Sequence, residues 1–339
     1  MKRRLFAKGL VAAGLTAPPV LGQATVEINA PGVYVNEQNA FPNSVMEVAT
    51  AVPAFIGYTE TATNGTTDLR NVPTRLTSMA DFQRLFGGPP VTKCEITVEN
   101  GLISAQPDAQ SRFLLYHGMQ MFFENGGGPC WVVSVGGYGT DTTPVDKGAD
   151  HFAKALEGLA REPEPTMVVM PDAVLLSVQD YARVSNEALA HCAQLQNRIA
   201  ILDVFDGDQP RTYGTDDIIS GTTGFRSVIR GDALSYGVAY YPWLNTSVQN
   251  ASDIGPANLT KASRQKLHDL IAAEQAKLRP GSAQITALLD ELKDADAADT
   301  SATHQALWSV SQIYQDAMNA LQAALSAMPP SAAMAGVYT

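Results

Sequence analysis

The sequence predicts an α/β fold: a largely parallel βαβ sheet with flanking helices, an N-terminal extended arm and strand region, and a helical C-terminal portion. The main observation is that short apolar runs alternate with segments of helical periodicity after residue 130. Strands that are buried on both faces of a parallel sheet have such continuous apolar runs. A second observation is that the chain becomes Ala-rich with helical spacing after residue 258. A third is that Pro and Gly separate short extended segments before residue 60.

The composition is that of a folded protein with a substantial core. The chain has 339 residues, of which 45% are hydrophobic and 17% are charged, which excludes a disordered chain, a coiled coil and a disulfide miniprotein. The 34 acidic and 23 basic residues give a net charge of -11, which argues against nucleic acid as the main partner. The three cysteines have no metal-type spacing, so reduced thiols are expected.

The first half of the chain begins with three extended segments, which are TVEI (25–28), GVYV (32–35) and VPAFIGYT (52–59). Before them, Met1–Ala24 combines a basic start with a short apolar stretch. This segment is interpreted either as a signal of the twin-arginine export type or as a flexible N-terminal extension. No segment is long and apolar enough to span a bilayer, so no membrane insertion is expected.

A short helix at 78–86 is predicted from Ser78 as its N-cap and from the Gly-Gly-Pro-Pro that follows. Residues 91–110 are polar and are expected to form a loop or hairpin insert. The remaining elements are predicted as helices at 111–124, 148–161, 177–196, 260–277, 282–294 and 302–327, strands at 130–135, 166–170, 198–204 and 236–243, and the beginning of a strand at 333–339. We accordingly divide the chain into 1–24, a signal-like or flexible extension; 25–110, the arm and first part of the core; 111–257, an α/β domain; and 258–339, a helical region.

Four acidic residues follow predicted strands, at the edge where open α/β sheets bind ligands. They are Asp172, Asp203, Asp206 and Asp208. Their carboxylates could bind Mg²⁺ or Ca²⁺, although helix caps and solvated loop acids have the same pattern. The first alternative function is therefore a nucleotide- or metal-binding enzyme on a flavodoxin-like sheet; the second is an exported surface protein.

Other motifs favour no catalytic function. Gly136-Gly137-Tyr138-Gly139 lacks the spacing of a dinucleotide or phosphate-binding loop and indicates a turn. His191 and Cys192 are adjacent on a predicted helix, so their side chains point about 100° apart and cannot form a nucleophile pair. No catalytic residue, cofactor or metal is predicted, and the chain is not expected to be an enzyme.

Several segments, in order along the chain, resemble the contractile tail sheath proteins of phages, R-type pyocins and extracellular contractile injection systems. PGVYVNE (31–37) is similar to the opening motif of that family. The further segments that resemble it are VPAFIGYTE (52–60), PTRLTS (73–78), FQRLFGG (82–88), FFENGGGPCWVV (122–133), Leu202-Asp203, YGVAYYPWL (236–244) and PPSAAMAGVY (329–338). Each motif is weak by itself, and their shared order carries the resemblance.

The resemblance implies a structural subunit that polymerises helically around an inner tube and contracts without hydrolysing nucleotide. The implied partners are further copies of the chain, the inner tube protein, and baseplate and tail-terminator proteins. Assembly in the bacterial cytoplasm is implied, followed by incorporation into a phage tail or a released or anchored injection particle. The chain stops at Thr339, at the entry to the family's C-terminal domain. The residues expected to supply an inter-subunit arm are Val26, Ile28, Pro31, Gly32, Val33, Tyr34, Val35 and Glu37.

Overall fold

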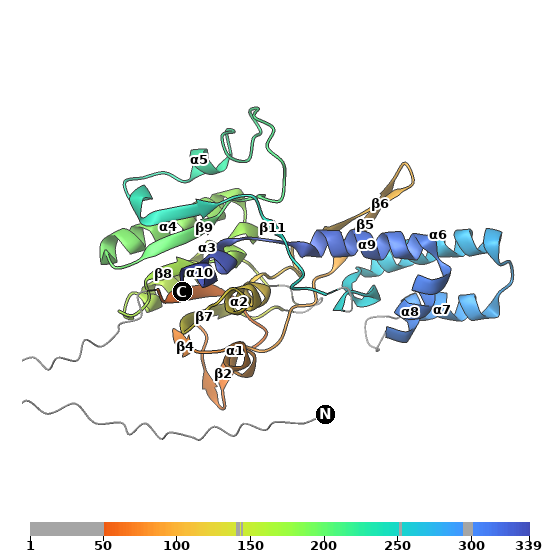
Figure 1. Ribbon diagram of the computed structural model, residues 1–339, viewed down its shortest axis with the longest axis horizontal. Helices are drawn as coiled ribbons and strands as arrows, with labels where there is room; N and C mark the ends of the chain where they lie inside the picture. Colours follow the sequence, from red (N-terminus) through yellow and green to blue (C-terminus); the bar gives the residue numbers. More distant parts are fainter. Residues whose placement is uncertain (1–50, 140–142, 144, 251–252, 294–300) are drawn as a thin grey trace, which may run out of the picture. The chain divides into compact units, whose positions relative to one another are not determined.

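The computed structural model describes residues 51–139, 143, 145–250, 253–293 and 301–339, all within a compact unit that spans Val48–Thr339 (Figure 1). The predicted strands at 25–28 and 32–35, the Met1–Ala24 extension and the expected arm residues lie outside the described residues.

A sheet of six strands forms the centre of the fold, and its order differs from the order of the strands in the chain. Across the sheet the strands are β10 (Gly237–Tyr240), β9 (Ile199–Asp203), β8 (Met167–Val169), β1 (Pro53–Tyr58), β7 (Cys130–Gly136) and β4 (Thr74–Leu76). All neighbours are parallel except β4, which pairs antiparallel with β7. The prediction of a mixed α/β fold with a largely parallel sheet is therefore confirmed. The first core strand of the chain lies in the middle of this sheet, where Phe55 is opposite Val132 on one side and Val169 on the other.

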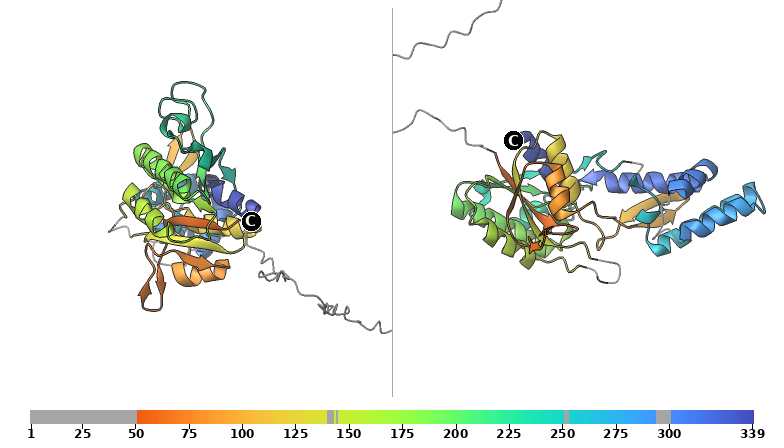
Figure 2. Two further views of the ribbon diagram at one scale, coloured as in Figure 1. Left: turned by 90° about the vertical axis from the view of Figure 1, so that its left-hand side faces the viewer. Right: turned by 90° about the horizontal axis from the view of Figure 1, so that it is seen from below.

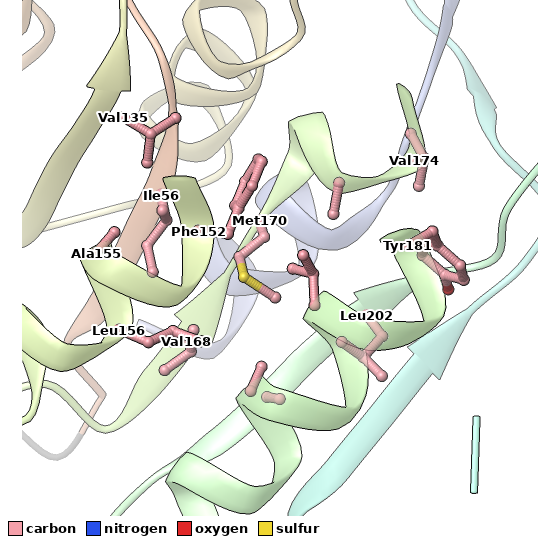
Figure 3. Close-up of a cluster of buried hydrophobic side chains, with 14 of the residues drawn as sticks. Ile56, Val135, Phe152, Ala155, Leu156, Val168, Met170, Val174, Tyr181 and Leu202 are labelled. Atoms are coloured by element: carbon pink, nitrogen blue, oxygen red, sulfur yellow. The ribbon is translucent and has the colours of Figure 1, made fainter. Parts of the chain in front are cut away.

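Helices cover both faces of the sheet (Figure 2). Helices α3 (Ala149–Leu159) and α4 (Val178–Leu195) pack on one face. Figure 3 shows this core, in which Phe152 and Tyr181 lie among aliphatic side chains such as Ile56 and Leu202. Helices α1 (Met79–Phe86), α2 (Leu115–Glu124) and α10 (Ser331–Tyr338) pack on the opposite face.

A third core lies apart from the sheet and joins two distant parts of the chain. The hairpin of β5 (Cys94–Glu99) and β6 (Leu102–Pro107) contributes Cys94, Ile96 and Ala105 to it. The other side chains of this core come from α6 (Lys261–Leu278), α7 (Ala283–Lys293), α8 (Ser301–Val310) and α9 (Gln312–Ser326). We call the hairpin and these helices the helical unit. The expected loop or hairpin at 91–110 is thus a hairpin that packs on helices from the second half of the chain.

The remaining elements are short. They are the hairpin of β2 (Thr63–Asn64) and β3 (Thr67–Asp68), the 3₁₀ turns η1 (Pro171–Leu175), η2 (Leu234–Tyr236) and η4 (Pro256–Asn258), helix α5 (Phe225–Val228), and the pair of β11 (Leu244–Asn245) and β12 (Ala327–Met328).

Two secondary-structure predictions are wrong. The segment 333–339 was expected to begin a strand, but it belongs to helix α10. The helix expected over 302–327 is interrupted at Ser311, which separates α8 from α9 and caps α9 by accepting a hydrogen bond from the Tyr314 amide at 3.1 Å. The last strand of the sheet is also shorter than expected, because β10 ends at Tyr240, directly before a cis Tyr241–Pro242 bond.

Candidate functional site

The strand order places a topological switch point between β1 and β8, because the chain leaves β1 for one side of the sheet and reaches β8 on the other. In open α/β sheets this point, at the carboxyl ends of the strands, is where ligands bind. Here Asp172 fills it. One carboxylate oxygen accepts a hydrogen bond from the Tyr58 amide at 2.8 Å and the other accepts one from the Leu114 amide at 2.5 Å.

The hydrogen bonds of Asp172 therefore connect three parts of the fold, which are the end of β8, strand β1 and the segment before α2. It is 1% exposed, and burial raises the pKa of its carboxyl, while the two amide donors oppose that rise. Both carboxylate oxygens are already used by backbone donors, which is the arrangement that a buried carboxylate requires.

Asp203, the last residue of β9, is a second buried carboxylate that connects distant segments, here β9 and α10. Its carboxylate accepts hydrogen bonds from the Ser331 amide at 2.8 Å and from the Ser331 hydroxyl at 2.5 Å. These bonds fix the first turn of α10 to the sheet. Burial raises the pKa of Asp203 to about 7, against the lowering effect of the two Ser331 donors.

The four acids that were considered as metal ligands do not form one site. Asp206 and Asp208 are exposed in the loop after β9, whereas Asp172 and Asp203 are buried and bonded to different segments. Among the residues that the structure describes, no group of three or more His, Cys, Asp or Glu side chains is arranged to hold a metal ion.

The glycine-rich segment 136–139 leads from the end of β7 into a loop, as the sequence indicates. Gly139 has a φ of 72°, and a Cβ there would lie 2.7 Å from the carbonyl oxygen of Thr143. The loop borders a hollow of about 870 Å³ whose lining also includes Glu60, Lys93 and Asp108. Glu60 uses one carboxylate oxygen to accept a hydrogen bond from the Gly88 amide at 2.6 Å.

His191 and Cys192 lie on α4 and do not form a pair, as their spacing predicts. Cys192 is fully buried in the core under α4, and burial raises the pKa of its thiol to about 12. The His191 ring faces the Arg198 guanidinium at 3.5 Å, and burial together with that charge lowers the pKa of His191 to about 4. The thiol is thus protonated and the imidazole is neutral at pH 7.

Lys147 is a half-buried cation that sequence reasoning missed. Its ammonium donates to the carbonyl oxygens of Ala109 and Arg112, both at 2.6 Å, and lies 4.0 Å from the centre of the Phe113 ring. Burial lowers the pKa of Lys147 to about 8. Nothing in the local sequence marks this lysine, because its acceptors are backbone carbonyls some 35 residues earlier in the chain.

Four of the segments that carry the sheath resemblance meet in one core on the α2 face of the sheet. Phe55 comes from the VPAFIGYTE segment, Phe82 and Phe86 from the FQRLFGG segment, and Phe122 from the FFENGGGPC segment; all four are buried in the same cluster. The rings of Phe55 and Phe122 lie 5.0 Å apart at 63°. The last segment, in α10, adds Ala332 and Ala335 to this cluster.

Glycines allow α10 to lie close to α2. A Cβ at Gly118 would be 3.2 Å from the Ala332 side chain, and a Cβ at Gly336 would be 2.5 Å from the carbonyl oxygen of Phe122. The PPSAAMAGVY and FFENGGGPC segments are therefore in direct contact, although about 200 residues separate them in the chain.

A groove lies at the amino ends of the strands. It has a volume of about 530 Å³, and Ala51, just before β1, lines it together with Tyr338, the last residue of α10. The first described residues and the end of the last helix thus border the same surface. Figure 1 places the chain terminus marked C beside the start of β1.

None of the helices in the described part of the chain is long and apolar enough to cross a membrane. No protein-family model matches the chain. No curated protein matches it either.

Proposed function

We propose that this chain is a structural subunit of a contractile tail-like sheath. In this proposal it polymerises helically around an inner tube, and contraction of the polymer drives the tube through a target envelope. The chain itself hydrolyses no nucleotide. Its partners are further copies of itself, the tube protein, and baseplate and terminator proteins at the two ends of the particle. Assembly takes place in the bacterial cytoplasm.

The observation that carries the proposal is the convergence of the sheath-like segments in one core. A chance set of short matches would have no reason to meet in space. Instead Phe55, Phe82 and Phe122 share one cluster with α10. This convergence supports a common origin for the segments as one packed unit. Within the FFENGGGPC segment itself, a Cβ at Gly127 would lie 2.6 Å from the Phe122 ring, which favours glycine at that position.

Two of the four acids that the enzyme alternative would use make hydrogen bonds within the fold. Asp172 and Asp203 each accept hydrogen bonds through both carboxylate oxygens, from Tyr58 and Leu114 and from Ser331 respectively. The metal- or nucleotide-dependent alternative therefore loses two of the four acids on which it was based. No other observation favours that alternative or the exported surface protein.

The mechanism that follows is a change of packing in a lattice with two states. Each subunit would hold an extended arrangement during assembly and release free energy to its neighbours when it repacks. Head-to-tail contacts that do not close on themselves give a filament. Extended arms that add strands to neighbouring sheets would keep the lattice connected while the bodies rotate. The net charge of -11 suits interfaces in which charge pairs are exchanged during contraction.

The test is immunoelectron microscopy of material sedimented from a lysate of the native host, with an antibody raised against residues 145–250. Antibody label along striated rods in a long and a short form is the expected result. The matched control is the same lysate from a host in which the gene is deleted, where the labelled rods should disappear. A soluble monomer beside unlabelled rods would contradict the proposal. The absence of rods, with the protein recovered outside the cytoplasm, would instead favour an exported surface protein.

A further inference from the structure

A further hollow lies beside α8 and α9, in the third core and apart from the sheet. Its volume is about 420 Å³, which is within the range of pockets that hold small molecules. Part of its wall is apolar: Ile254 and Met318 are buried, whereas Trp308 is 38% exposed. The other described lining residues are polar, and none of them is Asp, Glu, Lys or Arg; they are His304, Gln305, Asn319 and Gln322. We call this hollow the α8–α9 pocket.

The contacts of His304 determine which of its ring nitrogens carries the proton. Its Nδ1 lies 2.9 Å from the hydroxyl oxygen of Tyr314, which is fully buried. A buried hydroxyl has to donate its hydrogen, and Nδ1 is its acceptor in the described part of the chain. Burial also lowers the pKa of His304, so the imidazole is neutral at pH 7. The ring proton is therefore on Nε2, which no other described residue engages, and this N–H is a donor for a ligand.

Gln322 supplies a group of the opposite kind. Its Nε2 donates to the Gln249 carbonyl at 3.0 Å, and this bond fixes which end of the amide is the nitrogen. Its Oε1 is buried, and no donor among the described residues reaches it. A buried carbonyl oxygen without a donor is uncommon and costly. An N–H group that reached this oxygen would therefore make a hydrogen bond that the described chain leaves unmade.

Two aromatic rings stand next to each other in the pocket wall. His304 and Trp308 are one turn apart on α8, and their ring centres are 5.8 Å apart with 38° between the planes. Met318 adds a thioether, which packs favourably against aromatic rings. Such a wall suits a flat ring system. An ionised ligand is disfavoured, because no described lining residue offers a charge to pair with it.

We propose that the α8–α9 pocket binds a small, uncharged, flat heteroaromatic molecule that has both a carbonyl group and a ring N–H. The carbonyl would accept from His304 Nε2, the ring N–H would donate to Gln322 Oε1, and the ring would pack on Trp308. Bicyclic lactams have this combination of groups, and so do the oxo-purine bases. The inference goes beyond the sheath proposal and does not depend on it, since the pocket is built by the third core rather than by the sheath-like segments.

The first test is isothermal titration calorimetry on the full chain with two probes, the bicyclic lactam carbostyril and the oxo-purine hypoxanthine. At least one of them should bind saturably, and the tighter one identifies which of the two ring types the pocket prefers. N-methylcarbostyril should bind at least about tenfold more weakly than carbostyril, because it lacks the hydrogen that Gln322 would accept. Naphthoate, which is flat but ionised, is the negative control. Failure of both probes to bind at millimolar concentration, or tight binding of naphthoate, would overturn the proposal.

The second test uses variants whose folding is first checked by circular dichroism and thermal unfolding. Trp308→Leu should weaken binding of the better probe at least about tenfold, whereas Trp308→Phe should keep most of it. Gln322→Leu should abolish the preference for carbostyril over its N-methyl form, an effect that a purely structural role of Gln322 would not produce. The matched control is Leu278→Ala, since Leu278 is an exposed apolar residue of the same unit outside the pocket. If Leu278→Ala weakens binding as much as Trp308→Leu does, or if Gln322→Leu leaves the preference intact, the inference is wrong while the sheath proposal stands.

Discussion

Replacement of Asp203 by Asn should remove a specific pH dependence from the stability of the fold. The buried carboxyl has a pKa of about 7, compared with an ordinary value of 3.8, so the folded state binds a proton that the unfolded state releases. A folded pKa above the unfolded one means that stability is fully present at low pH and is lost as the pH rises through the folded pKa. Wild-type stability should therefore fall between about pH 4 and about pH 7.

The size of the effect follows from the same values. The pKa of Asp203 rises by about three pH units, from 3.8 to about 7, and each unit corresponds to about 1.4 kcal/mol. Ionisation of the carboxyl therefore costs the folded state about 4 kcal/mol. Asparagine resembles the protonated acid at every pH and can still accept the hydrogen bond of the Ser331 amide. The variant should thus match the wild type near pH 4 and exceed its unfolding free energy by about 4 kcal/mol near pH 8.

The assay is urea unfolding, followed by circular dichroism, at a series of pH values for both proteins. Asp232→Asn is a suitable control, since Asp232 is exposed in a loop. Ser331→Ala should make the wild-type decline steeper, because it removes the hydroxyl that donates to the charged form. A difference between Asp203→Asn and wild type that stays constant with pH would refute the reasoning. A wild type that gains stability as Asp203 ionises would refute it as well.

Two further predictions concern Lys147 and Gly127. Burial lowers the pKa of Lys147 to about 8 from 10.5, so the unfolded state binds a proton more readily than the folded state between these pH values. The unfolding free energy of the wild type should therefore rise relative to that of Lys147→Met as the pH increases from about 8 to 10.5. If urea unfolding gives the two proteins the same dependence of unfolding free energy on pH, the prediction is wrong. Gly127→Ala should lower the unfolding free energy by about 1–3 kcal/mol, because the new Cβ would lie 2.6 Å from the Phe122 ring. Gly148→Ala, whose Cβ would have no neighbour within 4 Å, is its control in thermal unfolding, and equal losses in both variants would show that the contact is unimportant.

Local signals in the sequence predicted most of the helices and strands, because those signals are also the physical determinants. Ser78 and Ser177 cap α1 and α4 by accepting amide hydrogen bonds from Asp81 and Asp180. The hairpin at 94–107 turns at Asn100-Gly101, where both residues have positive φ values of 52° and 79°. Such turns depend on the residues within them and can be predicted from the sequence.

Long-range packing determined the features that could not be predicted. The segment 333–339 is a short apolar stretch whose periodicity does not distinguish a strand from a helix. Its helical state depends on Asp203, 128 residues away from Ser331, and on the close contact that Gly118 of α2 allows. The central place of β1 likewise depends on the crossover connections and has no local signal. The candidate acids were identified at the correct edge of the sheet, but their hydrogen bonds to distant amides could not be inferred.

The two parts of the helical unit, the β5–β6 hairpin and helices α6 to α9, depend on each other for their core. The two parts leave the α/β core at neighbouring points, where the Asn258 side chain donates to the Thr92 carbonyl at 3.2 Å and the Lys93 ammonium donates to the Ala257 carbonyl at 2.9 Å. Deleting the hairpin alone would expose the apolar side of α6 and α9, and deleting the helices alone would leave Ile96 and Ala105 without cover. The hairpin and the helices, about 150 residues apart in the chain, therefore stabilise each other and should be removable only together.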